Sequence, residues 1–242
     1  MSYLDEIGAW TRERLDERRE TRSLAASLLE HGSSSVIAEV KRASPSQGAI
    51  AEGADPASVA RQYAADGAAA ISVLTSARDF GGSYADLAEV RAVVDLPILC
   101  KDFFVDVWQV TEARVHGADV ILVLLALVED ALAVDLIQAA EDLEMEAIVE
   151  VHSGPELERA LDLGTPIIGV NARDLATLEI DRARQIDLLR RLPRGLLRIA
   201  ESGIETPEHA RTARDAGADA LLVGTALMRD PALLPALVRS GA

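Results

Sequence analysis

The sequence predicts an α/β fold, a (β/α)8 TIM barrel with an N-terminal helical extension. Three observations predict it. The 242-residue length suits one α/β barrel. From residue 36 onward, short β-branched runs alternate with Ala/Leu-rich segments whose apolar residues recur every three or four positions. These strand–helix units number eight, at spacings of roughly 20–30 residues, as a closed parallel barrel requires.

Residues 1–35 precede the first strand, and we expect one or two amphipathic helices there, covering the barrel floor or lying near its mouth. Residues 36–242 would form the barrel. Gly-Ala steps at Gly67, Gly117 and Gly217 predict helix ends, because glycine accepts the left-handed cap conformation. The expected strands are 36–41, 69–75, 97–103, 119–125, 146–152, 166–173, 197–203 and 220–225.

A doubly wound open sheet is the alternative fold. It normally has a glycine-rich loop after its first strand, and the segment after residue 41 has none. We find no linker or low-complexity tract that would indicate a second domain.

Composition limits the possible partners and surroundings. A net charge of −16 argues against binding to nucleic acid and against binding to an anionic membrane surface.

The residue composition also bears on the source of the protein. Two lysines against 22 arginines, with abundant alanine and 40 acidic residues, predict a halophilic source, although a GC-rich genome would also favour Arg and Ala codons. The N-terminus lacks an apolar signal region, and the longest apolar run, 120–128, is too short for a bilayer. We expect a soluble cytoplasmic protein. The single cysteine, Cys100, fits a reducing compartment and a buried structural role.

The two lysines, Lys41 and Lys101, stand at the ends of predicted strands. An ammonium group can release a proton, whereas guanidinium stays charged, so positions that keep lysine indicate acid–base chemistry. Active sites of such barrels lie at the carboxyl ends of the strands. The polar residues expected there are Glu39, Lys41, Ser44, Lys101, Glu150, Asn171, Arg173, Glu201 and Ser202.

Strand alternation places Glu39 beside Lys41, and Asn171 beside Arg173. Glu39–Lys41 and Glu150–Lys101 taken alone would be ordinary structural ion pairs. Charged groups converging from several strands instead favour a catalytic site.

The segments after the last two strands predict a phosphate site. AESG and VGTALMRDP place Gly203, Gly224 and Thr225 where backbone amides can approach an anion, and a short helix starting near Thr225 would add its dipole. Phe80 and Phe103 suit the walls of a pocket for a flat ring. The histidines show no metal-ligand spacing, so no metal is predicted; His152 follows Glu150 on the same strand face and would support it.

These motifs carry a family resemblance. AEVKRASPSQG, LTSARDFGGS, ILCKDF, EVHS, GVNARDLATLEID, AESGI and VGTALMRDP closely resemble the indole-3-glycerol phosphate synthase family over about residues 36–231. The resemblance implies a TIM barrel that closes the indole ring of 1-(2-carboxyphenylamino)-1-deoxyribulose 5-phosphate, releasing carbon dioxide and water, with no cofactor. It implies a small phosphorylated substrate, and we expect a monomer.

The resemblance also implies residue roles. Lys101 resembles the general acid for ring closure and Glu150 the general base for dehydration. Lys41 resembles the lysine that neutralises the substrate carboxylate, with Glu39 orienting it. The remaining implied contacts are Asn171 and Arg173 on the anthranilate, Glu201 and Ser202 on the ribulose, Ser44, Gly203, Gly224 and Thr225 on the phosphate, and Phe80, Phe103 and Leu122 around the ring.

Two positions depart from the family pattern. Ala43 stands where some members have a second lysine, and Thr225 stands in place of a serine. Two other functions stay open. A phosphoribosyl-anthranilate isomerase-like barrel would need a Cys/Asp pair, but Cys100 is predicted on the strand face opposite Lys101. The other is a non-catalytic barrel that only binds phosphorylated ligands.

Overall fold

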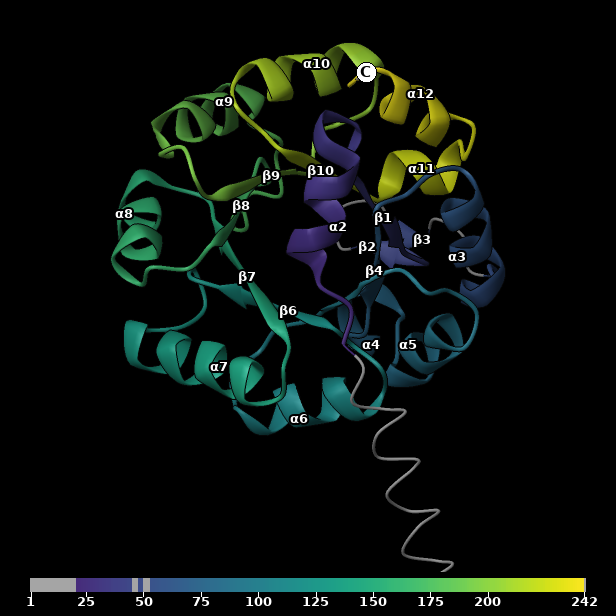
Figure 1. The fold of residues 1–242 in the computed structure, drawn as a ribbon, viewed down its shortest axis with the longest axis horizontal. Helices are drawn as coiled ribbons and strands as arrows, with labels where there is room; N and C mark the ends of the chain where they lie inside the picture. The colour runs from purple at the N-terminus through teal and green to yellow at the C-terminus, as the bar shows by residue number, and fades with distance from the viewer. Residues whose placement is uncertain (1–20, 45–47, 50–52, 242) are drawn as a thin grey trace, which may run out of the picture.

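The computed structural model describes residues 21–44, 48–49 and 53–241. Among these residues, eight parallel strands close into a barrel in the order β1-β10-β9-β8-β7-β6-β5-β4 (Figure 1). This confirms the predicted (β/α)8 fold. The barrel strands are β1 (Val36–Val40), β4 (Ala70–Leu74), β5 (Ile98–Lys101), β6 (Val120–Leu124), β7 (Glu146–Val151), β8 (Ile167–Asn171), β9 (Leu197–Glu201) and β10 (Ala220–Val223).

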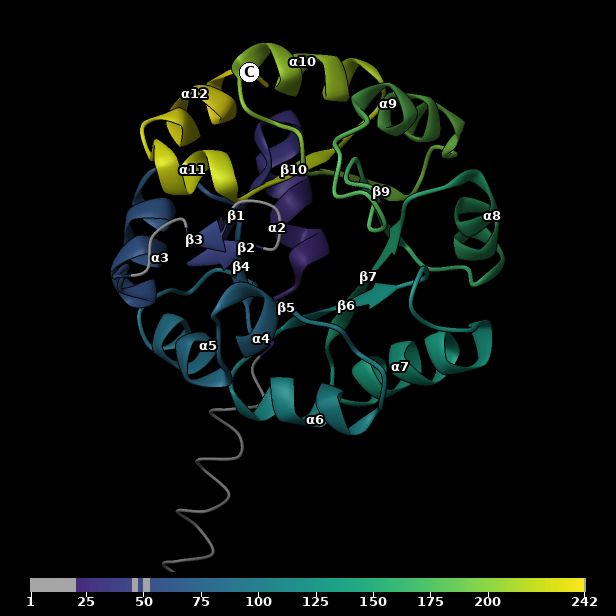
Figure 2. The same ribbon diagram turned by 180° about the vertical axis from the view of Figure 1, so that it is seen from behind.

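Helices surround the barrel on its outside (Figure 2). Asp or Ser/Thr side chains accept backbone N–H groups at the starts of many of them, as N-caps do, for example Ser83, Ser153 and Thr206. The helices are α2 (Leu24–His31), α3 (Pro56–Ala65), α4 (Ala77–Phe80), α5 (Tyr84–Arg91), α6 (Trp108–Val115), α7 (Asp130–Asp142), α8 (Gly154–Asp162), α9 (Arg182–Arg191), α10 (Pro207–Asp215), α11 (Thr225–Arg229) and α12 (Leu233–Arg239), with a 3-10 turn η1 (Gly32–Ser34) and a two-stranded ribbon of β2 (Ala43–Ser44) and β3 (Gly48–Ala49).

Alternation along the strands divides the apolar side chains between two layers. Inward-facing residues such as Ile37, Leu122 and Ile199 fill the barrel. Outward-facing residues such as Val149 and Cys100 pack with the helices. Cys100 is fully buried in this outer layer, as predicted, and burial raises the pKa of its thiol to about 12.

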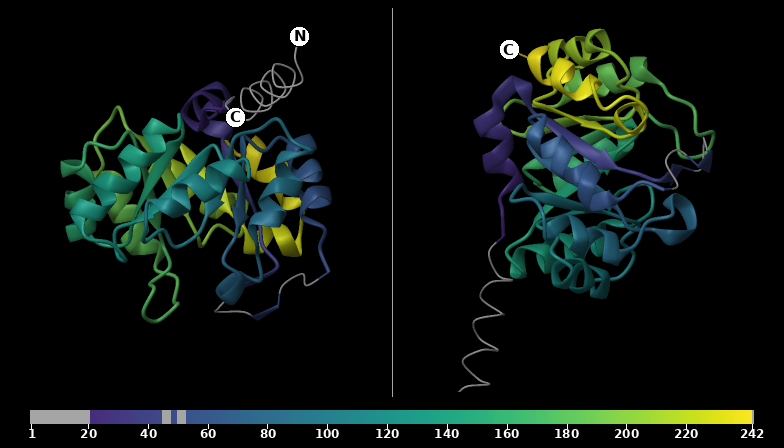
Figure 3. Two further views of the ribbon diagram at one scale, coloured as in Figure 1. Left: turned by 90° about the horizontal axis from the view of Figure 1, so that it is seen from below. Right: turned by 90° about the vertical axis from the view of Figure 1, so that its right-hand side faces the viewer.

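Helix α2 covers the barrel floor, the end at which the strands begin. Leu24 and Leu28 are buried and pack against the interior apolar layer. The Glu146 carboxylate, at the start of β7, accepts the backbone N–H groups of Leu24 and Ala25 at the first turn of α2. Figure 3 shows α2 on one side of the barrel, with the β2–β3 ribbon and the segment after β8 on the opposite side.

Of the predicted extension, residues 1–20 lie outside the described residues, so the boundary at residue 35 stays a prediction. The glycines that follow three helices, Gly67, Gly117 and Gly217, have φ angles of 93°, 97° and 109°, as expected for helix ends. In the part of the chain described, none of the helices has the length and apolarity to cross a membrane.

Candidate active site

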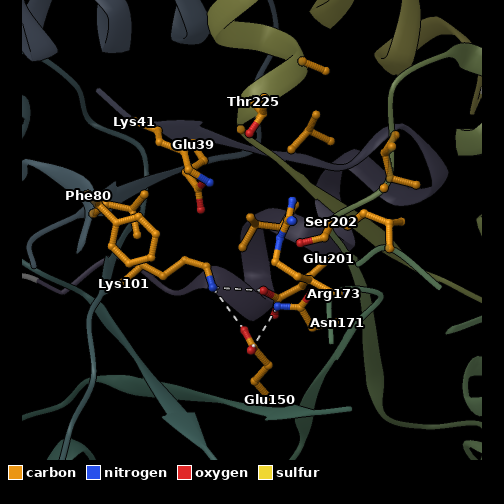
Figure 4. Close-up of a pocket in the computed structure, with 18 of the residues that line it drawn as sticks. Glu39, Lys41, Phe80, Lys101, Glu150, Asn171, Arg173, Glu201, Ser202 and Thr225 are labelled. Carbon is orange, nitrogen blue, oxygen red and sulfur yellow. Dashed lines mark hydrogen bonds and ion pairs between the residues drawn. The ribbon is translucent and has the colours of Figure 1, made fainter. Parts of the chain in front are cut away.

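A pocket of about 580 Å³ opens at the carboxyl ends of the strands. Its size suits a small organic ligand. Every site residue predicted from the sequence lines this pocket except Ser44 (Figure 4 labels ten of the lining residues). Ser44 ends the strand β2, and its side chain lies outside the described part of the structure.

Lys101 is the centre of the charged network. Its Nζ donates a hydrogen bond to Glu150 Oε2 at 3.0 Å and lies 3.3 Å from Glu201 Oε2. The three residues come from β5, β7 and β9, and Figure 4 shows them converging in the pocket. Both glutamates are buried, with 2% and 1% of their surface exposed, so their charges depend on each other and on Lys101.

The network separates the pKa values of its members. Burial alone would lower the pKa of Lys101, but the charges of Glu150, Glu201 and Glu39 raise it above its usual range. Burial would raise the pKa of Glu150, yet Lys101 and His152 hold it below its usual range. Burial and the neighbouring Glu150 charge raise the pKa of Glu201 to about 8. The charges therefore favour a protonated Lys101 and an ionised Glu150 at neutral pH.

Two further groups lie against the Glu150 carboxylate. Asn171 Nδ2, on β8, donates a hydrogen bond to Glu150 Oε1 at 3.0 Å. His152 Nε2 lies 3.1 Å from the same oxygen. The other oxygen, Oε2, faces Lys101, so both oxygens of the predicted base have fixed partners.

Glu39 and Lys41 form a second pair on β1 and at its end. Lys41 Nζ donates a hydrogen bond to Glu39 Oε1 at 3.2 Å, and lies 5.5 Å from the centre of the Phe80 ring. Phe80 in turn lies 6.1 Å from Phe103, with the ring planes 27° apart. The cation and the two rings form one side of the pocket, where a flat anionic ring would fit.

Two glycines make room for the buried carboxylates. A Cβ on Gly169 would collide with Glu201 Oε1, and a Cβ on Gly224 would collide with Glu39 Oε1. Both glycines lie at inward-facing positions, on β8 and just after β10. Their lack of a side chain lets these glutamates occupy the barrel interior.

The predicted anion site lies after β9 and β10. Ser202 has a φ of 62°, which is uncommon for a residue with a side chain and frequent at functional sites. Gly203 follows with a φ of 73°. Thr225 begins α11, as the sequence predicted. These residues and Gly224 all line the pocket.

The segment 172–181 after β8 forms a turned-back hairpin over this side of the barrel. Arg173 pairs with Ile180 in an antiparallel bridge, and its guanidinium donates to the carbonyl oxygen of Leu178 at 2.7 Å. Its backbone N–H donates to Asn171 Oδ1 at 2.9 Å. Arg173 is thus held beside the network that contains Glu150.

Sequence reasoning missed several lining residues. Leu175, Leu178 and Ile180 of the hairpin reach the pocket, as does Arg229 at the end of α11. Leu178 and Ile180 belong to the motif GVNARDLATLEID. Their spacing of two residues could have indicated that both face the pocket, but the hairpin was not recognised from the sequence. Among the described residues, no group of three or more His, Cys, Asp or Glu side chains is arranged to hold a metal ion.

Oppositely charged groups collected at the carboxyl ends of the strands are what (β/α)8-barrel enzymes use for acid–base chemistry. The chain is therefore a barrel enzyme of this class. Residues 6–237 match the family described as "Indole-3-glycerol phosphate synthase". The chain belongs to the indole-3-glycerol phosphate synthase family, whose members are carboxy-lyases of tryptophan biosynthesis.

Named relatives support this membership. An indole-3-glycerol phosphate synthase from Beutenbergia cavernae is 45% identical, over 94% of this chain and 90% of its own length. Another from Streptomyces coelicolor is 46% identical, over 96% and 92%. One from Micrococcus luteus is 52% identical, over 80% and 72%. Among solved structures, a thiamine phosphate pyrophosphorylase from Pyrococcus furiosus is similar with a TM-score of 0.62 at 16% identity, covering 86% of this chain and 94% of that one, which shows the fold alone.

Proposed function

We propose that this pocket performs the family's reaction by general acid–base catalysis. The substrate is 1-(2-carboxyphenylamino)-1-deoxyribulose 5-phosphate, and the products are indole-3-glycerol phosphate, carbon dioxide and water. The strongest support for this proposal is the position of the Lys101 ammonium group, which lies between the buried carboxylates of Glu150 and Glu201 in the pocket. Ring closure onto a carbonyl needs a proton donor, and restoring aromaticity needs a base.

Lys101 is the proton donor for ring closure. As the aromatic carbon attacks the ribulose carbonyl, the carbonyl oxygen becomes an alkoxide, which is far more basic than an amine. The proton then moves from Lys101 to this oxygen although the resting pKa of the lysine is raised. The adjacent Glu150 and Glu201 keep the donor protonated until that moment.

Glu150 is the base for dehydration. The closed ring loses its hydroxyl as water and one proton from the ring system, and an ionised carboxylate within the pocket accepts that proton. Asn171 fixes the carboxylate through Oε1. Glu201 and Ser202 lie on the side that receives the ribulose chain.

The remaining residues bind and orient the substrate. Lys41, positioned by Glu39, neutralises the anthranilate carboxylate, with Arg173 and Asn171 nearby. Phe80, Phe103 and Leu122 enclose the aromatic ring. The phosphate binds at Ser44, Gly203, Gly224 and Thr225, through backbone amides and hydroxyl groups. Ala43 leaves this site without the side-chain cation that some family members have there.

Cys100 argues against the isomerase-like alternative. Such a reaction would need a thiol in the pocket, but Cys100 is fully buried in the outer layer that packs with the helices. Its raised pKa also disfavours the reactive thiolate.

Incubation of the purified chain with the substrate tests the proposal. We expect the indole product to form, followed by the fluorescence of its new ring, and one carbon dioxide to be released for each product molecule. Tight binding of the substrate with no turnover, in dilute buffer and in high KCl, would instead support the non-catalytic ligand-binding barrel.

We also propose that the enzyme works in a salt-rich cytoplasm as a monomer. The net charge of −16 and the near absence of lysine support the adaptation to salt. Light scattering during size-exclusion chromatography tests the monomer. Melting temperature and activity measured at increasing KCl concentration test the adaptation to salt.

A further inference from the structure

Two residues that face the same side of the pocket come from separate segments of the chain. Lys41 follows β1, and Phe80 ends α4, beyond the end of β4. The ladder between these strands pairs Val40 with Val73 and includes neither pocket residue. Lys41 Nζ nevertheless lies 5.5 Å from the centre of the Phe80 ring, and Figure 4 shows the two side chains close together. Contacts outside the barrel ladder must therefore hold this pair.

Arg42, the residue after Lys41, makes such contacts. Its guanidinium donates to both carboxylate oxygens of Asp86, in the first turn of α5, with Nη1 to Oδ2 at 2.9 Å and Nη2 to Oδ1 at 2.7 Å. Nη1 also donates to the carbonyl oxygen of Gly81, and Nε donates to that of Ala54, both at 3.3 Å. One side chain thus connects the end of β1 to the segment before α3, the turn after α4 and the start of α5.

These contacts fall on the immediate neighbours of the two pocket residues. Arg42 adjoins Lys41 in the chain, and Gly81 adjoins Phe80. Arg42 is not among the described residues that line the pocket. Its charge is paired instead with Asp86, which has only 7% of its surface exposed. Arg42 therefore acts from behind the pocket wall.

The acceptor of this pair is itself held in place. Ser83 Oγ accepts the backbone N–H of Asp86 and caps α5, which leaves the Asp86 carboxylate available to Arg42. A Cβ on Gly82 would collide with the carbonyl oxygen of Leu74, so the turn between α4 and α5 lies directly against the end of β4. The carboxylate is thus a fixed point to which the segment after β1 is attached.

We propose that Arg42 and Asp86 are a positioning pair that sets the Lys41 ammonium against the Phe80 ring. They would thereby shape the side of the pocket that receives the anthranilate part of the substrate. A planar guanidinium bonded to both oxygens of one carboxylate fixes direction as well as distance. The inference rests on the proposed function, which gives Lys41 and Phe80 their roles, and neither member of the pair contacts the substrate.

The pair acts on substrate binding rather than on proton transfer. Lys101 and Glu150 lie on β5 and β7 and bond directly to each other, and the contacts of Arg42 fall elsewhere. Without the pair, Lys41 and Phe80 lose their fixed separation. The anthranilate ring and carboxylate are then bound less tightly before and during the reaction, which raises KM and leaves kcat nearly unchanged.

The variants are Arg42→Lys and Asp86→Asn. Lysine keeps the charge but not the two parallel hydrogen bonds, and asparagine keeps the size of the side chain and the backbone cap. The matched control is Asp219→Asn at the barrel floor, where Arg198 Nε and Nη2 donate to the two Asp219 oxygens at 2.9 and 3.0 Å. It breaks an equivalent pair far from the strand ends that form the pocket. Asp86→Asn keeps the test valid should Arg42→Lys not fold.

Steady-state assays give kcat and KM, and competition with the substrate gives the inhibition constants of anthranilate and inorganic phosphate. We expect KM and the anthranilate constant to rise by about tenfold or more in both variants, with kcat and the phosphate constant within about threefold of the wild type. The double variant should match the more affected single variant, because the two residues act as one unit. Asp219→Asn should lower the melting temperature and leave all four constants near the wild-type values.

The positioning role is overturned if anthranilate and phosphate inhibition weaken equally, if kcat falls as much as KM rises, or if the control variant shows the same changes. Additive effects in the double variant, or a wild-type enzyme that anthranilate does not inhibit, would also overturn it. A wild-type chain that makes no indole product would contradict the proposed function itself, so the two failures are distinguishable.

Discussion

The Lys101 ammonium donates a hydrogen bond to Glu150 Oε2 at 3.0 Å, so the proposed acid and the proposed base are direct partners. Each holds the other in its working protonation state: the carboxylate charge raises the pKa of the lysine, and the ammonium charge lowers that of the glutamate. The same contact lets a proton return from base to acid after dehydration. In the proposed mechanism, one pair of residues thereby serves both halves of the reaction.

Replacing Glu150 with glutamine should retain the fold and reduce kcat by about two orders of magnitude or more, because an amide cannot accept the ring proton. Stopped-flow absorbance should show the closed, hydroxylated ring accumulating before dehydration. A kcat close to that of the wild type would show that Glu150 is not the base.

Gly169→Ala should lower the catalytic activity by displacing the Glu201 side chain. The added Cβ would collide with Glu201 Oε1 and displace a carboxylate that contacts Lys101. We expect kcat to fall by about tenfold or more while circular dichroism stays native. Gly53→Ala is the control, because nothing described lies within 4 Å of a Cβ there. Equal activity in the two variants would contradict the role of Gly169.

The stability of the enzyme should depend on pH through His152. Its pKa is about 9 in the folded protein and about 6.5 when unfolded, so the folded state binds more protons between these values. The free energy of unfolding therefore falls as pH rises from 6.5 through 9, by at most about 1.4 kcal/mol per pH unit for this one proton.

Glu201 adds a fall of the same sign, centred lower, because its pKa is raised to about 8 from 4.5. Urea titrations of the wild type and His152→Gln at several pH values isolate the histidine contribution. We expect a shallower fall in the variant above pH 6.5. Parallel curves for the two proteins would contradict the assigned charge of His152.

Potassium chloride should raise both the melting temperature and the activity. A net charge of −16 creates repulsion within the folded state, and salt screens it. A KCl series from dilute buffer to molar concentrations, followed by differential scanning fluorimetry and steady-state assay, measures this. Full stability and activity in dilute buffer would contradict the proposed adaptation to salt.

The barrel and most of the site were predictable because both follow from local patterns. β-branched runs and glycine-terminated helices define the strand–helix units, and polar residues such as Lys101 and Glu150 interrupt the apolar strands where they end. The predicted strands extend one to several residues past some observed ends. Arg173 and Gly203, for example, leave the parallel ladder and face the pocket instead.

Contacts between distant segments were not predictable from one sequence. Glu146 caps the start of α2 across the barrel floor, a pairing that depends on how the helix is placed. Glu156 meets His152 because a tight turn connects β7 to α8, and the helix-capping pattern in the sequence gave no reason to expect this contact. The closeness of Gly169 to Glu201 likewise required the barrel's register.

Comparing Lys101→Arg with Lys41→Arg tests the central claim, that Lys101 acts as an acid and Lys41 as a binding charge. Arginine keeps a positive charge but does not release its proton. We predict that kcat falls by about a hundredfold or more in Lys101→Arg, and that Lys41→Arg keeps part of its activity with a raised KM. Near-normal kcat in Lys101→Arg, with native circular dichroism, would contradict the account.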